Sequence, residues 1–123
     1  MYTDITISNP AKPHLQPVTT RSLVDTGSLF LCILEHIAIQ LELQEFEKRE
    51  VTIADVSKQL CAYVGPLRID FANRMCLTRA LVLGNQPLLG AVPIEEMDLV
   101  FRPAQLKLIV NPANPNIPGA IAM

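Results

Sequence analysis

The sequence lacks tryptophan and has only three cysteines and two histidines. Cys32, Cys61 and Cys76 are odd in number, far apart and without C-x-x-C spacing, which argues against a disulfide framework and a zinc site. We expect free, mostly buried thiols. His14 and His36 have no second ligand at helical spacing, so we interpret them as a loop residue and a helix-face residue. The sequence therefore predicts no metal and no organic cofactor.

The sequence also lacks a strong charge of one sign and any long apolar run. Its formal net charge is −2, and the only dense charge cluster, from Glu45 to Glu50, contains both signs, so nothing here attracts a polyanion. The longest apolar run, from Leu29 to Leu34, is far too short to cross a bilayer. The N-terminus has no basic region followed by an apolar stretch, which is the pattern of a signal peptide. We expect a soluble, cytoplasmic protein that binds neither nucleic acid nor membrane.

What is present is an ordinary globular composition. The chain has 123 residues, of which 50% are apolar, so we expect one core built mainly from Leu, Ile, Val and Ala. We interpret residues 1–110 as a single folded domain and residues 111–123 as a Pro- and Asn-rich tail. The tail is too rich in these residues for regular structure, and it is either disordered or lies across a partner.

Period-two alternation and β-branched residues predict about seven short strands. The predicted strands include Tyr2 to Ser8, Val18 to Val24, Leu29 to Leu34, Leu67 to Phe71, Met75 to Leu83 and Leu106 to Val110. Val51 to Ala54 and Ala62 to Val64 are the predicted arms of a hairpin, which Gly65-Pro66 separates from the next unit.

Two short helices complete the prediction. The first covers Glu35 to Leu43, with Glu45 to Glu50 as its solvated exit. The second starts at Pro93, has Glu95 and Glu96 in its first turn, and ends near Leu99. This pattern favours an all-β fold, a closed or folded-over β structure with one or two short helices.

One motif carries chemistry. Asp25-Thr26-Gly27 follows the predicted strand Val18 to Val24, at a strand end where a side chain is well displayed. The triplet alone is a weak signal, because three given residues in order occur by chance in some chains of this length. It gains weight from Ser28 beside it and from the apolar-apolar-Gly unit Leu88-Leu89-Gly90 far downstream.

With these neighbours the sequence resembles the bacterial and retroviral single-lobe aspartic peptidases, the retropepsin-like family. The resemblance covers most of the chain. Its segments are Ile5, Ser22 to Ser28, Leu41-Glu42-Leu43, Val51 to Asp55, Val64-Gly65, Pro87 to Gly90 and Met97-Asp98-Leu99. It implies a retropepsin-like closed β-barrel protomer, a flap hairpin over a cleft, and aspartic endopeptidase activity on a peptide or protein substrate.

A single motif per chain agrees with that chemistry. Hydrolysis of an amide by water needs a base to activate the water and an acid to protonate the substrate, and one aspartate cannot be both at once. Two carboxylates about 3 Å apart repel by roughly 5 kcal/mol at an effective dielectric of 20, so the pair shares one proton, as is known for aspartic peptidases as a class. The resemblance therefore implies a homodimer in which each chain supplies Asp25.

The resemblance also implies roles for the residues around Asp25. Thr26 hydrogen-bonds across the dimer axis beneath the two aspartates. Gly27 is needed where backbone lies close to substrate or to the other chain. Ser28 donates a hydrogen bond to the Asp25 carboxylate and favours its charged form.

Ala54, Asp55 and Val56 are the likeliest substrate contacts of the flap under the same resemblance. The sequence departs from the family pattern at two places. Val56 stands where many relatives have glycine, and Ala91 stands where viral members commonly have an arginine that ties the helix to the rest of the fold.

Alternatives remain open at this stage. Asp25-Thr26-Gly27 can be a polar turn that closes a strand. The chain can be a catalytically weak or inactive peptide-binding or dimerisation module, or an enzyme that processes only itself. Asp55 or Asp70 can be proposed as a second carboxylate within one chain. Glu95, Glu96 and Asp98 are interpreted as a solvated helix start and not as a calcium site.

Overall fold

The computed structural model describes residues 1–53 and 55–122, and within them the chain is mainly β. Its strands are β1 (Tyr2–Ser8), β2 (Val18–Val24), β3 (Leu31–Ile33), β4 (Gln44–Thr52), β5 (Lys58–Phe71), β6 (Arg74–Val82), β7 (Leu88–Leu89), β8 (Leu99–Arg102) and β9 (Lys107–Val110). Its helices are α1 (Glu35–Gln40) and α2 (Ala91–Glu96), with a 3-10 turn at Pro103–Gln105. The predicted all-β class is confirmed, and no described helix is long and apolar enough to span a membrane.

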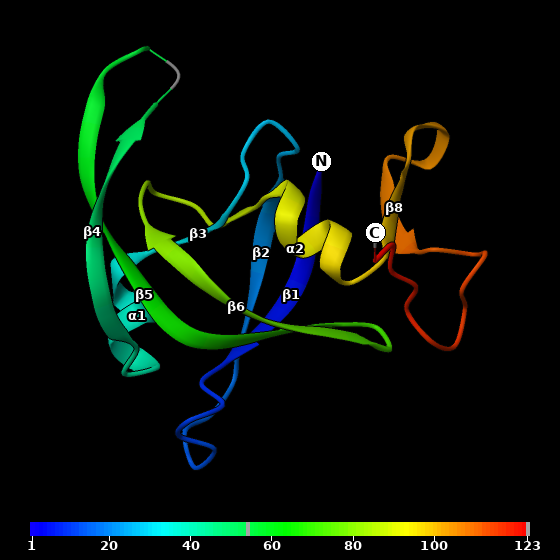
Figure 1. The fold of residues 1–123 in the computed structure, drawn as a ribbon, viewed down its shortest axis with the longest axis horizontal. Helices are drawn as coiled ribbons and strands as arrows, with labels where there is room; N and C mark the ends of the chain where they lie inside the picture. The colour runs from blue at the N-terminus through cyan, green and yellow to red at the C-terminus, as the bar shows by residue number, and fades with distance from the viewer. Residues whose placement is uncertain (54, 123) are drawn as a thin grey trace.

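Seven of the strands form one sheet that closes on itself. Their order is β1-β2-β7-β3-β6-β5-β4, and β1 also pairs with β5. Six strands therefore form a ring, and β4 extends from β5 as a long hairpin that projects away from the ring (Figure 1). Closure satisfies the backbone groups that an open sheet leaves unpaired at its edges.

The short strand β7 lies between β2 and β3, which are consecutive in the chain. β7 runs parallel to β2, with Val24 opposite Leu89, and antiparallel to β3, with Cys32 opposite Leu88. The connection between β2 and β3, residues 25–30, therefore has to pass over the end of β7. This crossing brings Asp25 next to a segment that is far away in the sequence.

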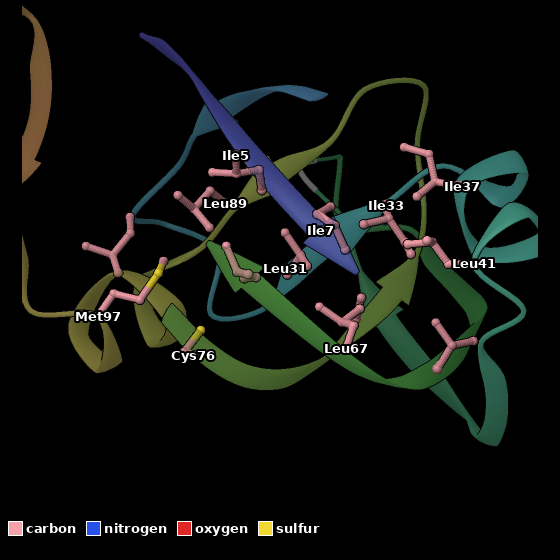
Figure 2. Close-up of a cluster of buried hydrophobic side chains, with 14 of the residues drawn as sticks. Ile5, Ile7, Leu31, Ile33, Ile37, Leu41, Leu67, Cys76, Leu89 and Met97 are labelled. Atoms are coloured by element: carbon pink, nitrogen blue, oxygen red, sulfur yellow. The ribbon is translucent and has the colours of Figure 1, made fainter. Parts of the chain in front are cut away.

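The apolar core fills the interior of the ring. Alternate residues of β1, β3 and β5 are almost fully buried, and Figure 2 shows those of β1 and β3 pointing toward one another. These alternate residues are Ile5, Ile7, Leu31, Ile33, Leu67 and Ile69. Ile37 and Leu41 cover one end of this cluster and Met97 covers the other (Figure 2). Burying each such side chain contributes about 2 kcal/mol, so the ring is the stable part of the molecule.

The prediction for residues 44–66 is wrong in two respects. Glu45 to Glu50 is not the exit of a helix, because it lies within strand β4. Gly65-Pro66 does not interrupt the chain's strand structure, because β5 continues through it from Lys58 to Phe71. The ladder with β6 shifts register between Val64 and Leu67, and a proline without an amide proton is tolerated at such an irregularity. The hairpin arms are therefore longer than predicted.

The second helix also differs from its prediction. It begins at Ala91, so Pro93 is its third residue, and the two glutamates lie in its last turn instead of its first. The Ala91 and Val92 amides donate to the carbonyls of Ser28 and Leu29, at 2.8 and 3.0 Å. The loop before β3 thus satisfies amides that a helix start normally leaves unpaired, which overrides the local preference for starting at proline.

The C-terminal tail is tethered to the rest of the fold by Asp98. The Asp98 carboxylate accepts hydrogen bonds from the side-chain amides of Asn111 (3.0 Å) and Asn114 (2.8 Å) and from the backbone amide of Gly119 (2.8 Å). The buried Arg74 donates to the carbonyl of Asn114 and lies 3.9 Å from Asp98. These contacts join the tail to β6 and to the end of α2.

We predict that acid releases this tether. The hydrogen bonds from Asn111, Gly119 and Asn114 hold the pKa of Asp98 below its usual value. The bonds to its charged form are therefore fully present above the unfolded pKa, about 3.9, and are lost as the pH falls through the lower folded pKa. We expect hydrogen-exchange protection of the Gly119 amide, corrected for intrinsic rates, to persist down to about pH 3.9 and to disappear as the pH falls through the lower folded pKa of Asp98.

Asp98→Asn keeps one acceptor oxygen for three donors and cannot titrate, so it should weaken the protection of this amide and remove its dependence on acid. Asp4→Asn, on the exposed face of β1, should change nothing. Protection of Gly119 that is insensitive to both acid and Asp98→Asn would contradict the assignment of the tether.

Candidate active site

Asp25 is the first residue after β2, and three backbone contacts define its position. Its amide donates to the carbonyl of Leu89 at 3.0 Å, and its carbonyl accepts from the amide of Ser28 at 3.1 Å. The Gly27 amide donates to Oδ1 of the Asp25 carboxylate at 3.0 Å. Asp25 is partly exposed. The loop therefore presents a carboxylate to solvent with one oxygen already oriented by a backbone donor.

Gly27 leaves the space that this carboxylate needs. A Cβ atom at residue 27 would lie 3.2 Å from Oδ1 of Asp25, closer than almost all ordinary contacts of that kind. Glycine is therefore favoured at residue 27 by this close approach within the single chain. Thr26 is exposed at the outer end of the same turn, so its hydroxyl is free to meet another molecule.

Ser28 behaves differently from its prediction within the single chain. Its hydroxyl donates to the carbonyl of Phe30, at 3.4 Å, and not to the Asp25 carboxylate. The hydroxyl also contacts the thiol of Cys32, whose pKa is raised chiefly by burial. All three cysteines are described, and they are buried free thiols, as predicted.

Gly90 packs closely against the backbone of the 25–30 loop. A Cβ atom there would lie 2.4 Å from the carbonyl oxygen of Phe30 and 2.7 Å from that of Ser28. Only glycine lets the two backbones come this close, and the contact allows the next two amides to bond to the loop. Asp25-Thr26-Gly27 and Leu88-Leu89-Gly90, which were selected from the sequence for their spacing alone, therefore lie in direct contact.

A cleft of about 970 Å³ opens beside Asp25. Its walls come from the 25–30 loop, from β4 and the start of the hairpin turn, and from the end of β6 with β7. Apolar side chains dominate the walls, among them Leu29, Phe30, Val51, Ile53, Leu81 and Leu83. A cleft of this size and polarity suits an extended chain with apolar side chains.

The predicted tip residues lie outside this cleft. Asp55 and Val56 are exposed and do not line it, while Ala54 lies outside the described residues. Asp55 accepts hydrogen bonds from the hydroxyl and the amide of Ser57, at 2.5 and 3.0 Å, and these lower the pKa of Asp55. The hairpin reaches the cleft through residues 49–53 and 59 instead.

Other carboxylates have partners of their own. Asp70 pairs with Arg68 at 2.9 Å, and Glu50, on the cleft wall, pairs with Lys58 at 3.3 Å. Neither Asp55 nor Asp70 lines the cleft, so neither completes a pair with Asp25. The described residues include no group of three or more His, Cys, Asp or Glu side chains placed to hold a metal ion.

Comparison with known proteins adds no assignment for this site. No protein-family model and no curated protein matches the chain. Its chemistry therefore has to be argued from the residues. One oriented, partly exposed carboxylate in an apolar cleft can take or give a proton, and a second acid or base is needed for the opposite task.

Sequence reasoning missed the cleft residues of β4, chiefly Arg49. Arg49 and Val51 alternate along β4 and so share one of its faces, and Ile53 follows two residues later, just beyond the end of the strand. This alternation can be seen in the sequence. However, the mixed charges of the neighbouring residues are typical of a solvated loop, so no strand was predicted at Arg49.

Val56 gives a prediction about the hairpin tip. It has φ 59°, a left-handed conformation that is unfavourable for a β-branched residue, and its side chain is 83% exposed. Asparagine tolerates this conformation, and no buried contact is lost. We expect Val56→Asn to raise the free energy of unfolding by about 1 kcal/mol, measured by urea denaturation.

Thr52→Asn, at an exposed β-branched residue in extended backbone, is the matched control and should lower stability slightly. Equal effects of the two substitutions would show that residue 56 carries no backbone strain.

Proposed function

We propose that this chain is one protomer of a homodimeric aspartic endopeptidase of the retropepsin type. Asp25 from each of two identical chains forms the acid–base pair, and water is the nucleophile. The observation that carries the proposal is the Asp25 carboxylate itself, which is partly exposed beside a cleft of about 970 Å³ on a loop fixed by β7 and α2. The ring of strands is, in this proposal, the retropepsin-like closed barrel.

The proposed reaction divides two tasks between two carboxyl groups. The charged Asp25 takes a proton from water as the water oxygen attacks the peptide carbonyl carbon. The protonated Asp25 of the other chain gives its proton to the carbonyl oxygen. Collapse of the tetrahedral species then moves a proton to the leaving nitrogen and breaks the C–N bond. The Gly27 amide supports this role because its hydrogen bond to Oδ1 fixes the direction of the carboxylate.

Pairing of two copies is supported by the surface beside the loop. Leu29 is 60% exposed and Val92 is 39% exposed, and a backbone hydrogen bond of 3.0 Å holds them together. Exposed apolar side chains next to an incomplete acid–base site suit a contact across a two-fold axis, where each copy covers the other. Thr26, exposed at the turn, is placed to join this contact.

The hairpin supports binding of an extended peptide. Among the residues that the structure describes, β4 has only one strand neighbour, β5, so its other edge offers free backbone donors and acceptors. A substrate can add to such an edge as an extra strand and place alternate side chains in the cleft. The β4–β5 hairpin is thus the proposed flap.

One observation favours a second candidate, a peptide-binding module that does not cut. The tip turn is closed by two backbone hydrogen bonds, Val56 to Ile53 at 2.8 Å and Ile53 to Ser57 at 3.0 Å. Together with the left-handed Val56 these bonds oppose the tip movement that a closing flap requires. Such a protein would hold peptides without hydrolysing them.

A peptide mixture separates the two candidates. The purified chain is incubated at mildly acid pH with peptides from a digested proteome, and both new termini and retained peptides are identified by mass spectrometry. The peptidase produces new internal termini, whereas the binding module retains intact peptides. Shortening of the chain itself with no other product would indicate self-processing alone. Neither cleavage nor retention would reject both candidates.

A further inference from the structure

Arg49 is the only basic residue among those that line the cleft beside Asp25. It lies on β4 opposite Cys61, with its side chain 42% exposed. It shares a face of β4 with Val51, which also lines the cleft. The cleft wall is therefore mainly apolar, with one cation and the carboxylates of Asp25 and Glu50 in it.

Two aromatic rings fix the position of this cation. The guanidinium carbon lies 4.2 Å from the ring centre of Tyr63 and 5.6 Å from that of Phe30. The two rings pack edge to face, with centres 5.8 Å apart, and Tyr63 is buried. Stacking of this kind holds a guanidinium by its face and leaves its N–H edge available for hydrogen bonds.

The hydrogen bonds of Arg49 are not complete. Its Nε donates to Oε1 of Glu47 at 2.9 Å, and among the described residues neither terminal nitrogen has a hydrogen-bond partner. Glu47 is 53% exposed, and an ion pair at such exposure contributes about 1 kcal/mol or less. An incoming carboxylate can therefore bind the free terminal nitrogens, with or without displacing Glu47. Glu50 also lines the cleft, but its carboxylate contacts Lys58, at 3.3 Å, and not Arg49.

We propose that Arg49 is a specificity-determining residue that binds the side-chain carboxylate of a Glu or Asp in a bound peptide. The planar fork of a guanidinium matches the two oxygens of a carboxylate, and an apolar surround strengthens the pairing. The preferred ligand is then an extended peptide with one acidic residue among apolar neighbours. Its cleavage rests on the proposed function, whereas its binding does not.

Matched peptide pairs test the proposal. A set of short apolar peptides carries Glu or Gln at each position in turn. Binding of each peptide is measured with the Asp25→Asn chain, and cleavage of each peptide is measured with the native chain. At about pH 6 the glutamate is charged. We expect the Glu peptide to bind and to be cleaved about tenfold better at one position, which corresponds to about 1.4 kcal/mol.

Substitutions at Arg49 provide the decisive comparison. Arg49→Gln should remove the preference, and Arg49→Glu should transfer it to a Lys peptide. Arg79→Gln is the matched control, because Arg79 also lies over Tyr63, at 5.4 Å, but does not line the cleft. It should keep the preference for Glu. If Arg49→Gln does not fold, Arg49→Lys keeps the charge without the fork and should retain only part of the preference.

The outcomes distinguish this inference from the proposed function. Equal binding of Glu and Gln peptides by the native cleft, or an unchanged preference in Arg49→Gln, would overturn it, as would binding of neither peptide. Cleavage of the Glu and Gln peptides at equal rates would support the peptidase proposal and reject the proposed role of Arg49. A Glu preference in binding with no cleavage at all would support Arg49 and reject the peptidase.

Discussion

Asp25→Asn is expected to abolish peptide hydrolysis while preserving the fold. Asparagine has nearly the same shape, and its Oδ1 can still accept the hydrogen bond from the Gly27 amide, which is 3.0 Å long in the native chain. It can neither take a proton from water nor give one to the substrate. Loss of acid–base catalysis of this kind costs about a thousandfold in rate or more. Initial rates on one identified peptide measure the effect.

Asp70→Asn is the control for Asp25→Asn. Asp70 pairs with Arg68 outside the cleft, so its substitution should leave the cleavage rate unchanged. The Asp25→Asn dimer should still form, because the native pair carries a single charge and its removal introduces no repulsion between the chains. Equal cleavage by native and Asp25→Asn chains would reject the enzyme proposal.

Gly90→Ala is expected to cause the largest loss of stability. The added Cβ would lie 2.4 Å from the carbonyl oxygen of Phe30 and 2.7 Å from that of Ser28, and both are backbone atoms that cannot rotate away. The loop and the start of α2 must separate, which breaks the amide bonds of Ala91 and Val92 to the loop. We expect a loss of about 3 to 5 kcal/mol in unfolding free energy, together with loss of activity.

Gly84→Ala is the control for Gly90→Ala. Gly84 has φ 82°, and a Cβ atom there would meet nothing within 4 Å. Its substitution should cost only about 1 kcal/mol, the cost of a left-handed conformation. Urea denaturation of both variants measures the difference, and similar losses would contradict the account of the crossing beneath Asp25.

The local sequence pattern was sufficient to predict a strand where one face of that strand is buried. β1 and β2 have the predicted bounds because buried and exposed residues alternate along them. β4 could not be recognised in this way, because most of its residues are exposed, as expected for a hairpin arm that projects from the ring. Without an apolar face, a charged strand and a charged loop look alike in sequence.

The remaining differences between the sequence-based predictions and the structure arise from tertiary contacts. α2 starts at Ala91 because carbonyls from residues 28 and 29 bind its first amides, and no local signal contains that information. Asp25, Gly27 and Gly90 could be selected from the motif, since each acts within the crossing of two short segments. Arg49 could not be placed, because its relation to Phe30 and Tyr63 depends on the register of β4.

Mixing native and Asp25→Asn chains tests the central claim most directly, namely that each site needs Asp25 from two chains. The native chain is kept at constant concentration, Asp25→Asn is added in increasing amounts, and the chains are given time to exchange partners. If a hybrid pair is inactive, activity per native chain falls in proportion to the native fraction, to about half at equal amounts. Activity that stays constant at every ratio would show that one chain is sufficient and would contradict the proposal.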